Sequence, residues 1–160
     1  MKMSIVGCIL LLAVPCGAAT APKLRPAVTR QPPQPVCGHW VVKKVIPTSG
    51  ISEAPNKAFL GLRATYLPAE MEFGQRVRIF NPLYKERRWS RARFFQASHI
   101  SASELGIKCK SVLEVDALDH RGGEVVDVGT MLFIRNENRL VTLWNGVFYQ
   151  LDRVGTPCGR

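Results

Sequence analysis

The sequence has few of the residues that usually mark a catalytic or metal site. Its only histidines, at positions 39, 99 and 120, lie in unrelated segments and lack the His-x-His or His-Glu-x-x-His spacing of a metal centre. No Gly-x-Ser-x-Gly elbow, phosphate-binding loop or dinucleotide fingerprint is present. We therefore expect a protein that holds no metal or cofactor and is not an enzyme.

No apolar run in the sequence is long enough to span a bilayer, because the longest covers only residues 5–14. A basic Lys2 precedes this run and small residues follow it, which is the pattern of a secretory signal peptide. We predict a signal peptide over residues 1–19, cleaved after Ala18 or Ala19. The mature chain should then have no transmembrane segment.

Export sets the compartment in which the protein meets its partners. We expect a periplasmic or secreted protein that does not meet intracellular nucleic acid. A lipid anchor on Cys16 is an alternative to simple cleavage, although Pro15 stands where a small residue normally precedes a lipidated cysteine.

Large apolar residues are almost missing from the segment that follows, residues 20–36, which contains five prolines. Such a segment cannot bury a core, and we interpret it as an extended, Pro-rich linker. The folded domain should then run over residues 37–158. This length is sufficient for one hydrophobic core and too short for two.

Apolar residues in this domain recur mainly with the period of a strand, in short runs bounded by Gly, Pro and Asn. The predicted strands cover residues 40–46, 62–66, 75–80, 111–118, 130–135, 139–144 and 146–153. Two short helices are predicted over residues 52–61 and 101–106, the second opening on a Ser-x-x-Glu capping box. We expect a mainly β fold, a small closed antiparallel barrel with two short helices, and a β-sandwich as the alternative.

A Gly-x-Trp motif at positions 38–40 opens the first predicted strand. It resembles the hallmark of the lipocalins, in which the Trp closes the floor of the barrel and an Arg from near the last strand lies across its ring. The resemblance implies a lipocalin-like barrel in which Trp40 and Arg153 are structural residues in cation–π contact. The Thr-Asp-Tyr-type turn and the long C-terminal helix of lipocalins are absent.

A wider pattern, which extends the same motif to Val42 and Lys44 and includes the later segment 146–149, resembles a second group of proteins. These are small exported bacterial proteins of unassigned function. This resemblance covers most of the domain and implies no activity.

Cysteine is scarce in the predicted mature chain, which keeps only Cys37, Cys109 and Cys158 and has no Cys-x-x-Cys pair. An odd number leaves at least one cysteine without an intramolecular partner. In a closed antiparallel barrel the first and last strands pair, so the start of one lies beside the end of the other. We therefore predict a disulfide between Cys37 and Cys158, with Cys109 free.

Acidic residues are outnumbered, with 12 Asp and Glu against 22 Lys and Arg. The basic excess is densest over residues 76–93, which we call the basic segment. Its basic residues are Arg76, Arg78, Lys85, Arg87, Arg88, Arg91 and Arg93. Guanidinium groups bind anionic oxygens and rings stack, so we predict that these residues and Trp89 bind an anionic partner. The alternative is a solvated face whose aromatic residues point into the core.

Two non-enzymatic functions are consistent with these features. In the first, the barrel mouth, lined by Met131, Phe133 and Tyr149, holds a small amphipathic or anionic molecule that the basic segment attracts. In the second, the barrel is a scaffold and the basic segment binds an acidic protein or an anionic envelope polymer, as an inhibitor or immunity-type protein would. An envelope hydrolase is a distant third, because no carboxylate pair or activated nucleophile is recognisable. An enclosed apolar cavity would favour the first function and a filled interior the second.

Overall fold

The computed structural model describes residues 28–33, 35–48, 54–156 and 158. The predicted signal peptide at residues 1–19, including Cys16, lies outside these residues, as do the first part of the predicted linker and the opening of the predicted helix at 52–61. Over the described residues the protein is mainly β, which confirms that part of the predicted fold class.

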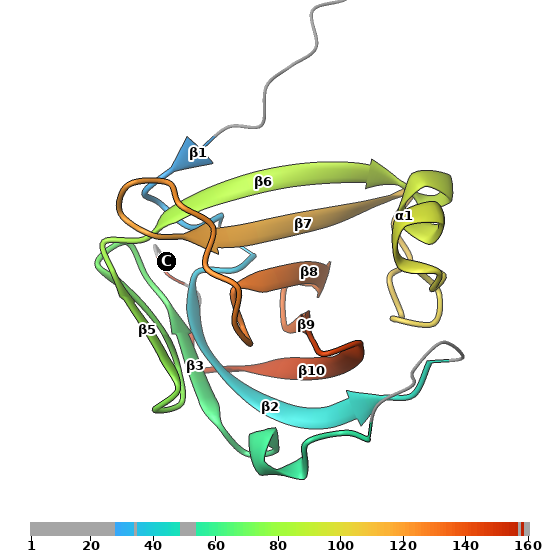
Figure 1. Cartoon of the computed structure of the whole chain (residues 1–160), viewed down its shortest axis with the longest axis horizontal. Helices are drawn as coiled ribbons and strands as arrows, with labels where there is room; N and C mark the ends of the chain where they lie inside the picture. The colour runs from blue at the N-terminus through green and yellow to red at the C-terminus, as the bar shows by residue number, and fades with distance from the viewer. Residues whose placement is uncertain (1–27, 34, 49–53, 157, 159–160) are drawn as a thin grey trace, which may run out of the picture.

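The elements follow one another along the chain as labelled in Figure 1. They are β1 (Val28–Thr29), β2 (Gly38–Ile46), the 3-10 helix η1 (Lys57–Phe59), β3 (Arg63–Tyr66), β4 (Glu70–Phe73), β5 (Val77–Phe80), β6 (Leu83–Ser90), α1 (Arg91–Ser98), β7 (Ser111–Leu118), β8 (Met131–Asn136), β9 (Arg139–Trp144) and β10 (Val147–Val154).

All these strands belong to one antiparallel sheet, in the order β1-β6-β7-β8-β9-β10-β2-β3-β4-β5. The sheet curls, so that β6 and β7 face β2 and β10 across the interior (Figure 1). It is not closed into the predicted barrel. Over the described residues β5 is the last strand at one edge of the sheet, and at the other edge β1 pairs with Tyr84 and Lys85 of β6.

Side chains fill the inner face of the curled sheet. The largest fully buried ones are Trp40, Tyr66, Met71, Phe73, Tyr84 and Tyr149. The buried hydroxyl of Tyr66 donates a hydrogen bond to the Gly129 carbonyl at 2.9 Å, and that of Tyr84 donates to the Leu67 carbonyl at 3.0 Å. These bonds satisfy polar atoms that would otherwise destabilise the core.

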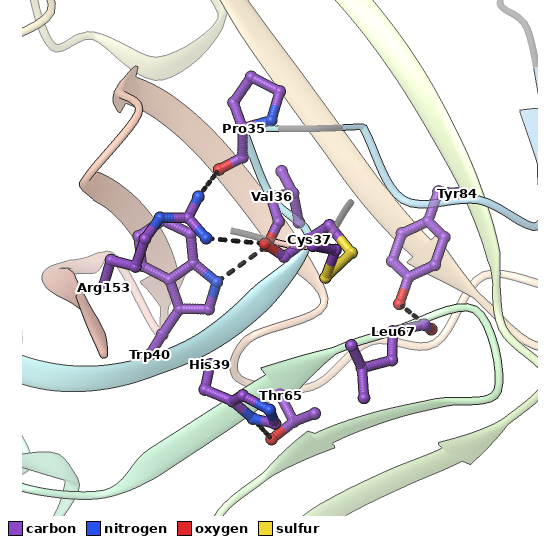
Figure 2. The surroundings of a disulfide bond; sticks show 10 residues. Pro35, Val36, Cys37, His39, Trp40, Thr65, Leu67, Tyr84 and Arg153 are labelled. Carbon is purple, nitrogen blue, oxygen red and sulfur yellow. Dashed lines mark hydrogen bonds between the residues drawn. A yellow bond between two sulfur atoms is a disulfide. The ribbon is translucent and has the colours of Figure 1, made fainter. Parts of the chain in front are cut away.

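Trp40 and Arg153 pack against each other where β2 begins and β10 ends (Figure 2). The guanidinium of Arg153 lies 4.1 Å from the centroid of the Trp40 ring. Its terminal nitrogens donate to the carbonyls of Pro35 and Cys37, at 2.9 and 2.7 Å, and the indole Nε1 of Trp40 donates to the Val36 carbonyl at 2.8 Å. We call this group of residues the Trp40 end.

The packing at the Trp40 end requires glycine at position 38, the first residue of the Gly-x-Trp motif. Gly38 has φ +133°, and a Cβ at this position would lie 2.7 Å from Nη1 of Arg153. A side chain would therefore both strain the backbone and displace the guanidinium. The motif and Arg153 form one packing unit, which is the arrangement that the lipocalin resemblance implies.

A disulfide joins Cys37 to Cys158 beside the same end, with a Cα–Cα distance of 5.7 Å, which confirms the predicted pairing. The two cysteines meet because β10 pairs with β2, with Arg153 opposite Trp40. Cys109 is free and exposed, as predicted.

The described part of the predicted linker lies against the domain, since β1 pairs with β6 and Val36 is fully buried.

A second apolar cluster covers part of the outer face of the sheet. Phe133 of β8 packs edge to face against Phe94 of α1, with 5.4 Å between ring centroids. The loop after α1 adds Ile100, Leu105 and Ile107 to the cluster. This packing fixes α1 and its loop at the end of the β6–β7 ribbon (Figure 1).

The helices differ from those predicted. Residues 101–106 form turns, although the capping box itself is present, with the Ser101 amide donating to Glu104 Oε2 at 2.8 Å. Gly106, at φ +72°, follows too soon for a helix to propagate. In the described part of residues 52–61 only η1 forms. The one α-helix of the described chain, α1, was not predicted.

Candidate functional site

The first two arginines of the basic segment are already paired with acids. Arg76 Nε lies 3.2 Å from Asp127 Oδ1, and Arg78 Nη2 donates to Glu70 Oε2 at 2.9 Å. The guanidinium of Arg76 also lies 5.3 Å from the centroid of the Trp144 ring. The positive charges of Arg76, just before β5, and of Arg78, within β5, are therefore each paired with a nearby carboxylate.

On β6, alternate residues Lys85, Arg87 and Trp89 lie on one face and meet carboxylates there. Arg87 contacts two carboxylates of β7, with its Nη1 3.0 Å from Glu114 Oε1 and its Nη2 3.8 Å from Asp116 Oδ2. Trp89 Nε1 donates to Glu114 Oε2 at 2.8 Å, and Arg87 lies over the Trp89 ring. Trp89 is thus held by its own neighbours rather than presented for stacking on a ligand.

Glu114 is only 3% exposed, and this burial sets its chemistry. Burial raises the pKa of its carboxyl and the neighbouring Asp116 raises it further, while Arg87 opposes the shift. Burial also raises the pKa of Asp116, again opposed by Arg87. One guanidinium is therefore shared between two carboxylates that are both desolvated.

The rest of the basic segment lies at the end of the β6–β7 ribbon, beside α1. We define the basic end as five exposed cations, namely Arg88, Arg91, Arg93, Lys108 and Lys110. Within the described chain none of them forms an ion pair with a carboxylate, in contrast to the four cations above.

Local contacts bring Arg88 near the backbone of Lys110 and Arg91 near that of Lys108. Arg88 Nη1 donates to Ser111 Oγ at 3.2 Å, and Ser111 directly follows Lys110. Arg91 Nη2 donates to the Ile107 carbonyl at 3.1 Å, and Ile107 directly precedes Lys108. Sequence reasoning missed the two lysines, because they lie far from the basic segment along the chain.

The N-terminus of α1 adds the positive end of a helix dipole to the positive charges of the basic end. Ser90 caps the helix by accepting from the Arg93 amide at 3.3 Å, and the first turn contains Arg91 and Arg93 but no acid. Cations near a helix N-terminus oppose the helix dipole, which favours anions at that position. The basic end is therefore suited to negatively charged groups.

The expected ligand site in a barrel mouth is not formed. Phe133 belongs to the outer cluster, whereas Tyr149 belongs to the inner one, so the two side chains lie on opposite faces of the sheet. The pairing explains the separation, because Tyr149 pairs with Thr142, which pairs with Leu132, the neighbour of Phe133. The prediction that Met131, Phe133 and Tyr149 line one cavity is wrong.

A cleft of about 350 Å³ opens instead between the loop over residues 124–130 and the β9–β10 turn. Apolar walls come from both sides and include Val125, Val126, Met131, Leu143 and Trp144. Arg87, Asp116, Glu124 and Asp127 also line it. This cleft lies at the surface and is not the interior of a barrel.

Over the described residues no group of three or more His, Cys, Asp and Glu side chains is arranged to hold a metal ion, and no helix is long and apolar enough to cross a membrane. Comparisons with protein-family models, curated proteins and solved structures found no match.

Proposed function

We propose that this chain is an exported, non-enzymatic binding protein whose curled sheet is a scaffold and whose basic end binds an anionic polymer of the cell envelope. The observation that supports the proposal is the contrast in pairing. Arg76, Arg78, Lys85 and Arg87 all have carboxylate partners, whereas the five exposed cations of the basic end have none in the described chain. A guanidinium has five N–H donors, so Arg88 and Arg91, with one described bond each, keep donors for anionic oxygens.

The filled interior supports a scaffold over a small-molecule carrier. The inner face is occupied by large buried side chains such as Trp40, Tyr66 and Tyr149, which leave the binding function to the surface. Export is supported by the Cys37–Cys158 disulfide, since disulfides persist in oxidising compartments. The cap formed by Trp40 and Arg153 supports the lipocalin-like interpretation of the fold.

An acidic protein is the alternative partner, as for an inhibitor or immunity-type protein. The same cations would bind it, and exposed Phe95 on α1, 53% accessible, would supply an apolar contact of the kind that protein interfaces use. The two partners differ in the anion that they present, which is phosphate in many polymers and carboxylate in an acidic protein.

The test compares two triple variants of the full-length protein. In the first, Arg88, Arg91 and Arg93 are replaced by Gln. In the control, the exposed cations Lys57, Arg63 and Arg121, which lie elsewhere, are replaced by Gln, so that the net charge falls equally. Polyphosphate and poly-L-glutamate serve as the two probes.

We expect the first variant to lose at least tenfold in affinity for polyphosphate, and the control to lose less than threefold. Stronger binding of poly-L-glutamate than of polyphosphate would favour an acidic protein partner. Equal losses in the two variants would show that only net charge matters and would contradict a binding site at the basic end.

A further inference from the structure

The cleft beside β6 and β7 has a composition that differs from the basic end. Its walls are mainly apolar, and Val126 at its rim is 87% exposed, the highest value among the exposed large apolar side chains of the described chain. Exposed apolar side chains beside a concave surface are typical of ligand sites, and about 350 Å³ is within the range of small-molecule pockets.

The charges around the cleft do not balance. Four carboxylates lie in or directly behind it, namely Glu114, Asp116, Glu124 and Asp127. Three cations contact them, through the pairs Arg76–Asp127, Lys85–Glu124 and Arg87 with both Glu114 and Asp116. One negative charge is therefore left without a cation of its own among the described residues.

Of the two carboxylates that share Arg87, Asp116 has the longer contact with it. Arg87 lies 3.0 Å from Glu114 but 3.8 Å from Asp116, which is beyond hydrogen-bond distance. The Asp116 side chain is only 15% exposed, so water does not fully solvate it, and it lines the cleft. A desolvated carboxylate in this position is stabilised by any donor that carries a positive charge.

We propose that the cleft binds a small amphipathic amine, with its ammonium group at Asp116 and its apolar body against Val126, Met131 and Leu143. A monovalent cation supplies the one positive charge that the cluster lacks. Trp144, whose ring contacts the guanidinium of Arg76, also lines the cleft and adds to its apolar wall. An anionic ligand would instead compete for Arg87 and leave Glu114, 3% exposed, without its cation.

The experiment uses three probes that share one apolar body and differ only in charge: 2-phenylethylamine, 2-phenylethanol and phenylacetate. Titration calorimetry on the unmodified protein should show the amine binding at least tenfold more tightly than the alcohol, and no measurable binding of the carboxylate. Equal affinity for the three probes, preference for phenylacetate, or no amine binding at millimolar concentration would overturn the proposal.

Variants then locate the site. Asp116→Asn should weaken amine binding at least tenfold and leave the alcohol unaffected, whereas Glu72→Gln on β4 should change neither. Because Asp116 is largely buried, a second pair of variants uses exposed Val126. Val126→Lys should weaken amine binding relative to Val126→Gln, and equal amine binding by these two variants would place the ligand elsewhere. The outcome is independent of the basic end, which these probes do not test.

Discussion

The Trp40 end and the basic end use arginine in opposite ways. Arg153 lies on the Trp40 ring and donates to the carbonyls of Pro35, Cys37 and Glu137, so its donors serve the fold. The arginines of the basic end are exposed. Arg88 and Arg91 each donate one described hydrogen bond to the protein, which leaves most of their N–H donors for a ligand. The environment of an arginine, rather than the local density of charge, separates a structural role from a binding role in this protein.

The largest expected effect concerns the disulfide at the Trp40 end. Replacing Cys37 and Cys158 together by Ser should lower the free energy of unfolding by about 4–5 kcal/mol, because the chain-entropy model assigns that value to a loop of this length, whose ends are 121 residues apart. Replacing Cys109 by Ser should have no measurable effect. Urea titration of both variants checks the difference, and equal losses would contradict the structural role of the bond.

Truncating the indole at the Trp40 end should have the next largest effect. Trp40→Ala should cost about 3–5 kcal/mol, since Trp40 is fully buried and such truncations leave a cavity. Phe80, which is 61% exposed, gives the matched control, and Phe80→Ala should cost less than about 0.5 kcal/mol. A loss below about 1 kcal/mol for Trp40→Ala in denaturant titration would show that it does not cap the core.

Two arginines of the basic segment should differ in the same way. Arg87→Gln should cost about 1–3 kcal/mol, because it leaves buried Glu114 without its cation. Arg93→Gln should change the free energy of unfolding by less than about 0.5 kcal/mol, because Arg93 is exposed. Thermal unfolding of the two variants at one pH measures the contrast. If Arg93→Gln proved the more destabilising, the division of the segment into structural and binding residues would be wrong.

The smallest stability effect is a dependence on pH. Because the pKa of Glu114 is raised in the folded protein, the native state binds more protons than the unfolded state over the interval above the ordinary value of 4.5. The free energy of unfolding should therefore fall as pH rises through this interval. In Glu114→Gln the free energy of unfolding should fall less steeply with pH. The part of the pH dependence that persists should come from Asp116, whose pKa is also raised. Unfolding titrations at several pH values check the two slopes, and identical slopes would exclude Glu114 as the source.

Much of the fold could be predicted from local patterns. The strands at 111–118 and 139–144 were predicted with the bounds of β7 and β9, because apolar residues and turn signals mark their ends. β6 was not predicted, since Lys85, Glu86, Arg87 and Arg88 hide its alternation, and its burial comes from pairing with β7. α1 ends at His99 in the left-handed region rather than at a glycine, so its stop signal was missing from the sequence.

The candidate sites were harder to predict, because they depend on contacts between distant residues. The basic segment was recognised by its composition, but composition does not tell that Arg87 is paired with Glu114, 27 positions away, or that Arg91 donates to the carbonyl of Ile107, next to Lys108. The cleft was not predicted at all. Its residues come from β6, β7, β8, β9 and the loop over residues 124–130, and only the curl of the sheet brings them together.

A direct test of binding at the basic end is to measure the affinity for polyphosphate as a function of salt concentration. The measurement compares the unmodified protein with the variant in which Arg88, Arg91 and Arg93 are replaced by Gln. Exposed charges are screened over about 8–10 Å at physiological ionic strength. We predict that the affinity of the unmodified protein falls steeply with salt and that the variant binds weakly with a shallower dependence. If the variant binds as tightly as the unmodified protein at every salt concentration, the basic end is a solvated surface and the proposed function is wrong.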